Sequence, residues 1–156
     1  MKTIKGDLIK LALQGNFDVI IHGCNCFNTM GSGIAKQVRS ELPAAWEADQ
    51  LTVKGDKSKL GLYTRALIEL PESTFTVINA YTQYKYGTDR MHVDYKAVSS
   101  LFKNIKVWYT GKRIAYPRIG AGLAGGDWEV ISNIINEELK GEDHTLVLFE
   151  KGSCDG

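Results

Sequence analysis

The 156-residue sequence lacks a long hydrophobic run, an excess of charge of either sign and a signal-peptide pattern. No apolar stretch reaches the ~20 residues that cross a bilayer, and residues 1–10 lack the apolar core of a signal peptide. The formal net charge of +1 creates no overall field that would attract nucleic acid or a membrane surface. We therefore expect a cytoplasmic protein, without a membrane partner, that holds any anionic ligand by local geometry.

Cysteine is also scarce, and the three that occur argue against a disulfide framework or a zinc site. Cys24 and Cys26 are too close in the sequence to form an easy bridge, and Cys154 falls in a polar tail. Tetrahedral zinc needs four ligands in recognisable pairs, which three cysteines and three scattered histidines do not supply. We expect no metal and no cofactor, and packing roles for Cys24 and Cys26.

Several catalytic signatures are missing. The sequence contains no GxxxxGK[ST] phosphate loop, no GxSxG nucleophile elbow and no HExxH zinc motif. A cysteine phosphatase would need an arginine six residues after its cysteine, but Met30 and Ser32 stand at those places after Cys24 and Cys26. Any hydrolytic chemistry must therefore use another arrangement.

Apolar patterning predicts strands that alternate with helices along the chain. The expected strands are residues 3–5, 18–24, 62–70, 75–81, 113–116 and 145–150. The expected helices are residues 8–13, 31–42, 94–109 and 128–139, with a further helix and a loop in the polar region 43–60. Lys54, Lys57 and Lys59 in that region are expected to be solvated. The alternation predicts one three-layer α/β domain over residues 1–156, with a largely parallel sheet and a frayed end at 151–156.

Two segments share the order strand, glycine loop, helix. They read HGCNCFNTMGSGIAKQV at residues 22–38 and YPRIGAGLAGGDWEVI at residues 116–131. Glycine lets backbone N–H groups approach an oxygen-rich ligand, and the start of a helix adds unpaired donors and a partial positive charge. Two such loops near the carboxyl edge of one sheet predict a crevice for a diphosphate.

The stretch GAGLAG, residues 120–125, also matches the dinucleotide-binding fingerprint GxGxxG. A dinucleotide-binding fold opens with this loop and continues through several βα units, whereas only one helix and one strand follow here. Glu142 and Asp143 lie at the spacing of a ribose-binding acid, but in a polar turn. We therefore reject a nicotinamide site.

Together with GDL at residues 6–8, the two loops resemble those of the macro domain family. Within that family the chain resembles the ADP-ribose 1''-phosphate phosphatase branch of yeast, phage and bacteria. That branch has His-x-Cys-Asn-Cys before its first glycine loop and a tryptophan at the start of its last helix, as here at residues 22–26 and Trp128. The resemblance covers almost the whole chain. It implies an α/β/α domain with a mixed, largely parallel six-stranded sheet and a cleft for ADP-ribose.

The resemblance also implies the residues that would bind ADP-ribose. Asp7, with Leu8 beside it, would hold the adenine amino group, and Phe149 would stack on the adenine ring. Asn25 would face the distal ribose. The segments that would surround the ribose and the phosphates consist of Met30, Gly31, Ser32, Gly33 and Ile34, and of Ile119, Gly120, Ala121, Gly122 and Leu123. Two alternatives stay open: Asp7 as a helix cap and Phe149 as a core side chain.

The candidates for catalysis are His22, Asn25 and Asp127. His22 shares a strand face with Cys24, and it could transfer a proton to a leaving sugar oxygen or be a buried histidine with a structural role. Asp127 could position a water molecule or cap the last helix. The family members that remove ADP-ribose from glutamate carry an aspartate directly after GxGL, where this chain has Ala124. Water would be the nucleophile, with catalysis by positioning and electrostatics.

Three functions are compatible with this pattern. The first is hydrolysis of ADP-ribose 1''-phosphate to ADP-ribose and phosphate by a monomeric enzyme. The second is removal of ADP-ribose from an ADP-ribosylated macromolecule, or of an acyl group from acylated ADP-ribose. The third is an ADP-ribose binding module without activity, because both an enzyme and a binder need the same glycine loops.

Overall fold

The computed structural model describes residues 1–150, so the predicted frayed end with Cys154 lies outside the described residues. Its strands are β1 (Lys2–Gly6), β2 (Val19–Cys24), β3 (Tyr63–Leu70), β4 (Ser73–Tyr81), β5 (Ile114–Tyr116) and β6 (His144–Phe149). Its helices are α1 (Leu8–Leu13), α2 (Gly33–Glu41), α3 (Pro43–Gln50), α4 (Tyr95–Tyr109), α5 (Trp128–Glu138) and a 3₁₀ helix at Lys57–Lys59.

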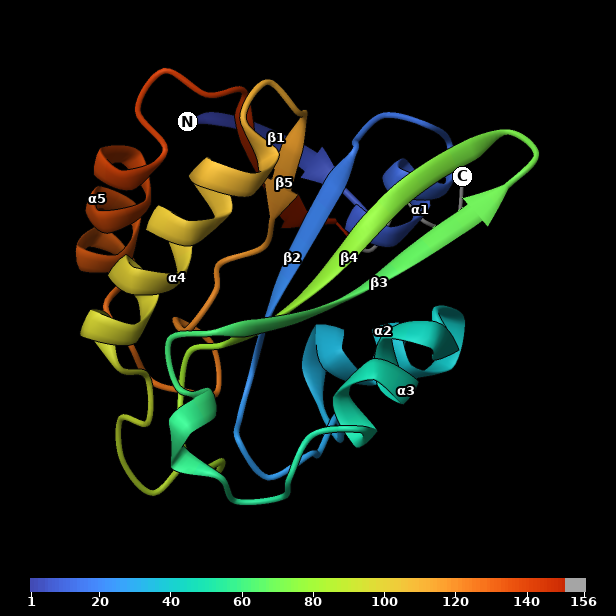
Figure 1. Cartoon of the computed structure of the whole chain (residues 1–156). Helices are drawn as coiled ribbons and strands as arrows, with labels where there is room; N and C mark the ends of the chain where they lie inside the picture. Colours follow the sequence, from blue (N-terminus) through green and yellow to red (C-terminus); the bar gives the residue numbers. More distant parts are fainter. Residues whose placement is uncertain (151–156) are drawn as a thin grey trace.

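The strands form one six-stranded sheet in the order β1-β6-β5-β2-β4-β3 (Figure 1). Every neighbouring pair is parallel except β3 and β4, which form an antiparallel hairpin at one edge. The prediction of a mixed, largely parallel six-stranded sheet is confirmed. Because β2 and β5 are parallel neighbours, the loops that follow them lie at the same edge of the sheet.

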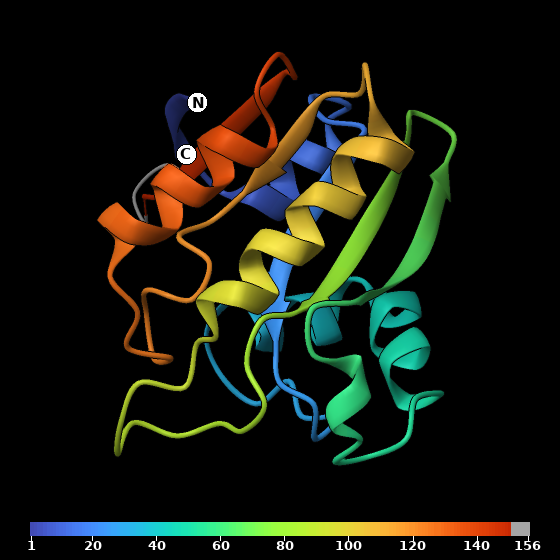
Figure 2. The same cartoon turned by 60° about the vertical axis from the view of Figure 1, so that its left-hand side comes forward.

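Helices cover both faces of the sheet. Helices α4 and α5 lie on one face, and α1, α2 and α3 lie on the other (Figures 1 and 2). Strand β2 is buried on both sides, since Val19 and Ile21 belong to the core under α4 and α5, whereas Ile20 and Cys24 belong to the opposite core. A strand covered on both faces has no polar side, which accounts for its continuous apolar run.

Most predicted elements lie within two residues of their observed bounds. Helix α2 starts at Gly33 rather than at the expected residue 31, because Ser32 is extended, with a φ of −153°, and acts as the N-cap. Pro43 ends that helical run as expected and opens α3, where its missing N–H costs no hydrogen bond. Cys24 and Cys26 are buried in the core, as expected of packing residues.

One expectation about the polar region is wrong. Lys59 is not solvated but buried, with 8% of its surface exposed. Its Nζ donates hydrogen bonds to Asn28 Oδ1 and Thr52 Oγ1, so that the ammonium exchanges water for fixed acceptors. Sequence patterning could not reveal this, because the acceptors come from segments 31 and 7 residues away.

No helix in residues 1–150 is long and apolar enough to cross a membrane.

Candidate functional site

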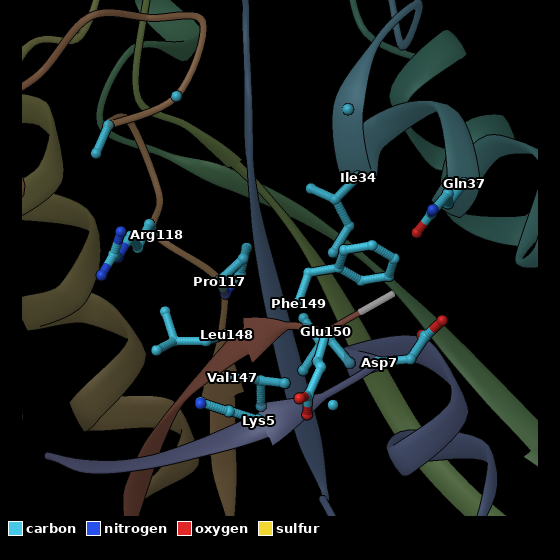
Figure 3. Close-up of a pocket in the computed structure, with 15 residues that line it drawn as sticks. Lys5, Asp7, Ile34, Gln37, Pro117, Arg118, Val147, Leu148, Phe149 and Glu150 are labelled. Atoms are coloured by element: carbon cyan, nitrogen blue, oxygen red, sulfur yellow. The ribbon is translucent and has the colours of Figure 1, made fainter. Parts of the chain in front are cut away.

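A cleft runs along the carboxyl ends of the parallel strands and consists of two adjoining hollows. The proximal hollow has a volume of about 880 Å³ and lies over the ends of β1 and β6 (Figure 3). The distal hollow has a volume of about 590 Å³ and lies over the end of β2. The hollows join because five residues line both: Gly33, Ile34, Pro117, Arg118 and Gly122. One extended ligand can therefore occupy both.

Asp7, Leu8 and Phe149 meet at the proximal end. The parallel register of β1 and β6 pairs Gly6 with Phe149, which brings the residues after β1 beside the end of β6. Phe149 is 61% exposed and lines the hollow, so its ring is not a core side chain. Figure 3 draws that ring between Ile34 and Asp7. Asp7 also caps α1, since its Oδ1 accepts a hydrogen bond from the Lys10 amide at 3.1 Å.

The first glycine loop presents a row of unpaired backbone amides. Within the described residues, the N–H groups from Met30 to Ile34 donate no hydrogen bond to another backbone group. Ser32 is the N-cap of α2, yet its hydroxyl makes no capping hydrogen bond. The start of α2 therefore keeps its free donors and its partial positive charge, which suits an anion.

A second row of amides belongs to the loop after β5. That loop is closed by two backbone hydrogen bonds, from Gly126 N to Gly120 O at 2.7 Å and from Gly125 N to Gly122 O at 3.1 Å. In the part of the chain that the structure describes, the amides of Gly120, Gly122 and Leu123 donate to no backbone oxygen. Both loops thus offer donors to the same cleft.

Four glycines of the two loops divide into two kinds. A Cβ on Gly120 would lie 2.6 Å from Val93, and one on Gly126 would lie 2.5 Å from the same side chain. Those two glycines are required by packing. A Cβ on Gly31 or Gly122 would meet no protein atom within 4 Å, and both residues line the cleft. The space beside Gly31 and Gly122 is therefore open toward the cleft.

Asn25 stands at the end of β2 and lines the distal hollow. Its Oδ1 accepts a hydrogen bond from Phe27 N at 2.8 Å, and its Nδ2 donates to Thr29 Oγ1 at 2.7 Å. The side chain is therefore fixed by its own loop rather than free to rotate. A fixed amide at this place can hold a ribose hydroxyl or a water molecule without further ordering.

His22 lies below the cleft and not in it. The side chain is 1% exposed and lines neither hollow of the described structure. Asn79 donates through Nδ2 to Ala45 O and Thr64 Oγ1, which leaves its Oδ1 to accept a hydrogen bond from His22 Nε2 at 2.6 Å. Burial lowers the pKa of His22 to about 4, so the ring is neutral at pH 7 and its one proton is engaged. This placement argues against direct proton transfer by His22, although it confirms that His22 and Cys24 share a strand face.

Two other predicted residues also lie outside the lining of the cleft. Asp127 is exposed and caps α5, with its Oδ1 accepting from Glu129 N at 2.9 Å. Met30 is buried in the core beneath the first loop, so only its backbone remains for a ligand. All the other predicted binding residues line the cleft: Asp7, Leu8, Asn25, Gly31, Ser32, Gly33, Ile34, Ile119, Gly120, Ala121, Gly122, Leu123 and Phe149.

Sequence reasoning missed one wall of the distal hollow. That wall follows β4 and consists of Gln83, Tyr86, Gly87 and Thr88. Strand β4 is parallel to β2, so its carboxyl end meets the same edge of the sheet, and this rule could have found the wall. Arg118 was missed too, and it is the one charged side chain among the described residues that line the distal hollow.

No family model matches the sequence. An uncharacterized 17.5 kDa protein of the tk–vs intergenic region of Enterobacteria phage T4 is 36% identical over 141 residues, which cover 87% of this chain and 88% of that protein. The ADP-ribose 1''-phosphate phosphatase of Candida albicans is 25% identical over 146 residues, with 88% and 92% covered. The macrodomain of Mycobacterium tuberculosis DarG superposes with a TM-score of 0.74 over 95% of both chains, at 20% sequence identity. The chain has the macrodomain fold. The similarity to each of these three proteins spans most of both chains.

Proposed function

We propose that this macrodomain binds ADP-ribose in its cleft and hydrolyses ADP-ribose 1''-phosphate to ADP-ribose and phosphate. The observation that carries the proposal is the two rows of amides without a backbone acceptor in the described structure, at residues 31–34 and at Gly120, Gly122 and Leu123, because all of these residues line one cleft. An exposed aromatic side chain lies at one end of that cleft and a fixed amide at the other. This order fits an adenine, a diphosphate and a distal ribose. The phosphatase from Candida albicans that this chain resembles supports the choice of substrate.

The electrostatics of the cleft fit a ligand that carries phosphates. The protein has a net charge of only +1, so local donors must hold the anion. The amides of the two loops, the N-terminus of α2 and Arg118 supply them. Arg118 lines both hollows, and its positive charge favours an anionic ligand in the cleft.

The chemistry requires one water molecule. Its oxygen attacks the phosphorus, the bond from phosphorus to the ribose oxygen breaks, and that oxygen leaves as the hydroxyl of ADP-ribose after taking up a proton. Asn25 would orient the water or the ribose, and the loop amides would stabilise the charge that builds up on the phosphoryl oxygens. Since His22 and Asp127 do not line the cleft, we assign the proton transfers to solvent.

The proposal is tested by measuring phosphate released from ADP-ribose 1''-phosphate. We expect the Asn25→Ala variant to be slower than the wild type by about a hundredfold, because the variant loses the group that positions the reactants. We expect the His22→Gln variant to stay within about threefold, since glutamine can still donate to Asn79 and His22 touches no substrate. No release by the wild type would refute the phosphatase activity, and a larger loss in His22→Gln than in Asn25→Ala would refute the assigned roles.

Phe149 should matter for binding and not for folding. Because the ring is exposed, Phe149→Ala removes little core packing, but it removes the surface on which adenine would stack. We expect the Kd for ADP-ribose and for AMP to rise about tenfold, which is the usual contribution of one base on an aromatic ring. Calorimetric titration measures this, with thermal unfolding as the check on stability. An unchanged Kd for AMP would place the adenine elsewhere.

A binding module without activity is the second candidate, and one observation favours it. Neither His22 nor Asp127 lines the cleft, and the described residues that line the distal hollow include no carboxylate and no histidine. Binding of ADP-ribose by calorimetry, together with no release of phosphate, would select this function. The predicted monomer, the cytoplasmic location and an ADP-ribosylated macromolecule as partner stay predictions.

A further inference from the structure

Lys59 is a buried cation that the proposed chemistry does not use. It lies on the 3₁₀ helix and lines neither hollow. Its Nζ is 2.6 Å from Asn28 Oδ1 and 3.0 Å from Thr52 Oγ1, and it lies 5.3 Å from the centre of the Tyr81 ring. A buried ammonium destabilises a protein unless it is hydrogen-bonded, so these contacts account for its presence.

Asn28, the first acceptor of Lys59, has an unusual backbone conformation. With a φ of 58°, Asn28 is the one non-glycine residue with positive φ among the described residues. Its Nδ2 donates to the carbonyl of Thr52 at 2.9 Å and to that of Asp49 at 3.3 Å, while its own carbonyl accepts from Gln50 Nε2 at 2.9 Å. Side-chain contacts of this kind hold a backbone in a conformation that costs free energy.

Asn28 lies in the segment that forms the floor of the distal hollow. Asn25 and Thr29, on either side of it, both line that hollow and are hydrogen-bonded to each other. If Asn28 leaves its left-handed conformation, Thr29 moves, and the side chain of Asn25 loses the partner that fixes it. The position of Asn25 therefore depends on contacts that Asn28 makes away from the cleft.

We infer that Lys59 is a positioning residue that holds residues 25–30 in the geometry needed to bind the distal ribose. The inference rests on the proposed function for its ligand. The inference predicts that the loss of Lys59 affects only one end of the cleft, which a general role in stability would not predict. Lys59 supports only the distal hollow, because the proximal end is built from Asp7 and Phe149 on other elements.

The test compares two ligands in the Lys59→Met variant. ADP-ribose reaches both hollows, whereas AMP, which lacks the distal ribose, fills only the proximal end. We expect the Kd for ADP-ribose to rise about tenfold, the effect of losing hydrogen bonds to a charged group, and the Kd for AMP to stay unchanged. Lys54→Met, which removes the same charge from an exposed position of the same loop, is the control and should match the wild type.

A second measurement needs no ligand. Hydrogen exchange of the backbone amides of Cys26 and Phe27, which donate to Tyr84 O and Asn25 Oδ1, should be faster in the free Lys59→Met variant than in Lys54→Met. Asn28→Gly, which keeps the positive φ accessible while removing the side-chain anchors, should show the same change if Lys59→Met does not fold. Unchanged exchange in these variants, or equal weakening of AMP and ADP-ribose, overturns the inference. A wild type that binds neither compound overturns the proposed function instead, and the exchange result still decides the role of Lys59.

Discussion

Replacing Gly122 by alanine is expected to weaken ADP-ribose binding by at least about a hundredfold, while the free energy of unfolding stays the same or rises slightly. Gly122 does not have a positive φ, and an added Cβ would meet no protein atom within 4 Å. At such a position alanine restricts the unfolded chain, which stabilises the protein by about 0.4–1 kcal/mol. The methyl group would instead occupy the space in which the loop amides approach the diphosphate. A hundredfold loss corresponds to about 2.7 kcal/mol of binding free energy.

Gly126→Ala is the contrasting variant for this experiment. There the added Cβ would lie 2.5 Å from Val93 Cγ1 and 2.6 Å from the carbonyl oxygen of Gly120. We expect the free energy of unfolding to fall by about 2 kcal/mol, as is usual for overpacking. Calorimetric titration and urea unfolding on both variants separate the two kinds of glycine. Wild-type affinity in a folded Gly122→Ala variant would show that the diphosphate does not lie against this loop.

The second large effect is a loss of stability as the pH falls. Burial lowers the pKa of both His22 and His144 from 6.5 to about 4 in the folded protein. Between these values the unfolded chain binds protons that the folded protein does not, so protonation favours unfolding. The stabilisation of the folded protein by its two neutral histidines is complete above pH 6.5 and is lost as the pH falls to 4. Between pH 7 and pH 5, each histidine should lower the free energy of unfolding by about 2 kcal/mol.

Urea unfolding at several pH values between 5 and 7 measures how steeply the free energy of unfolding changes with pH. In the His22→Gln variant the slope should fall to about half, because His144 still titrates and glutamine does not. Asp49 acts in the opposite direction, since burial raises the pKa of its carboxyl group. An unchanged slope in His22→Gln would mean that His22 titrates normally in the folded protein. That result would reopen a role for His22 in proton transfer.

The tertiary contacts of His22 explain why its role could not be settled from the sequence. The pattern HGCNC correctly placed His22 on a buried strand beside Cys24, but the same residues fit a catalytic histidine and a structural one. The partner that decides between them, Asn79, is 57 residues away on β4. Lys59 is a second example. A lysine in a polar stretch is expected to be solvated unless acceptors from distant segments surround it.

By itself, the sequence determined the order of strands and helices and the positions of the two glycine loops. Those features depend on apolar periodicity, glycine and helix capping, which act between neighbours along the chain. Tertiary structure decided which side chains line the cleft, that a wall after β4 closes the distal hollow, and that His22 and Lys59 are buried. These outcomes depend on pairing and packing between segments far apart in the sequence, where local propensity carries no information.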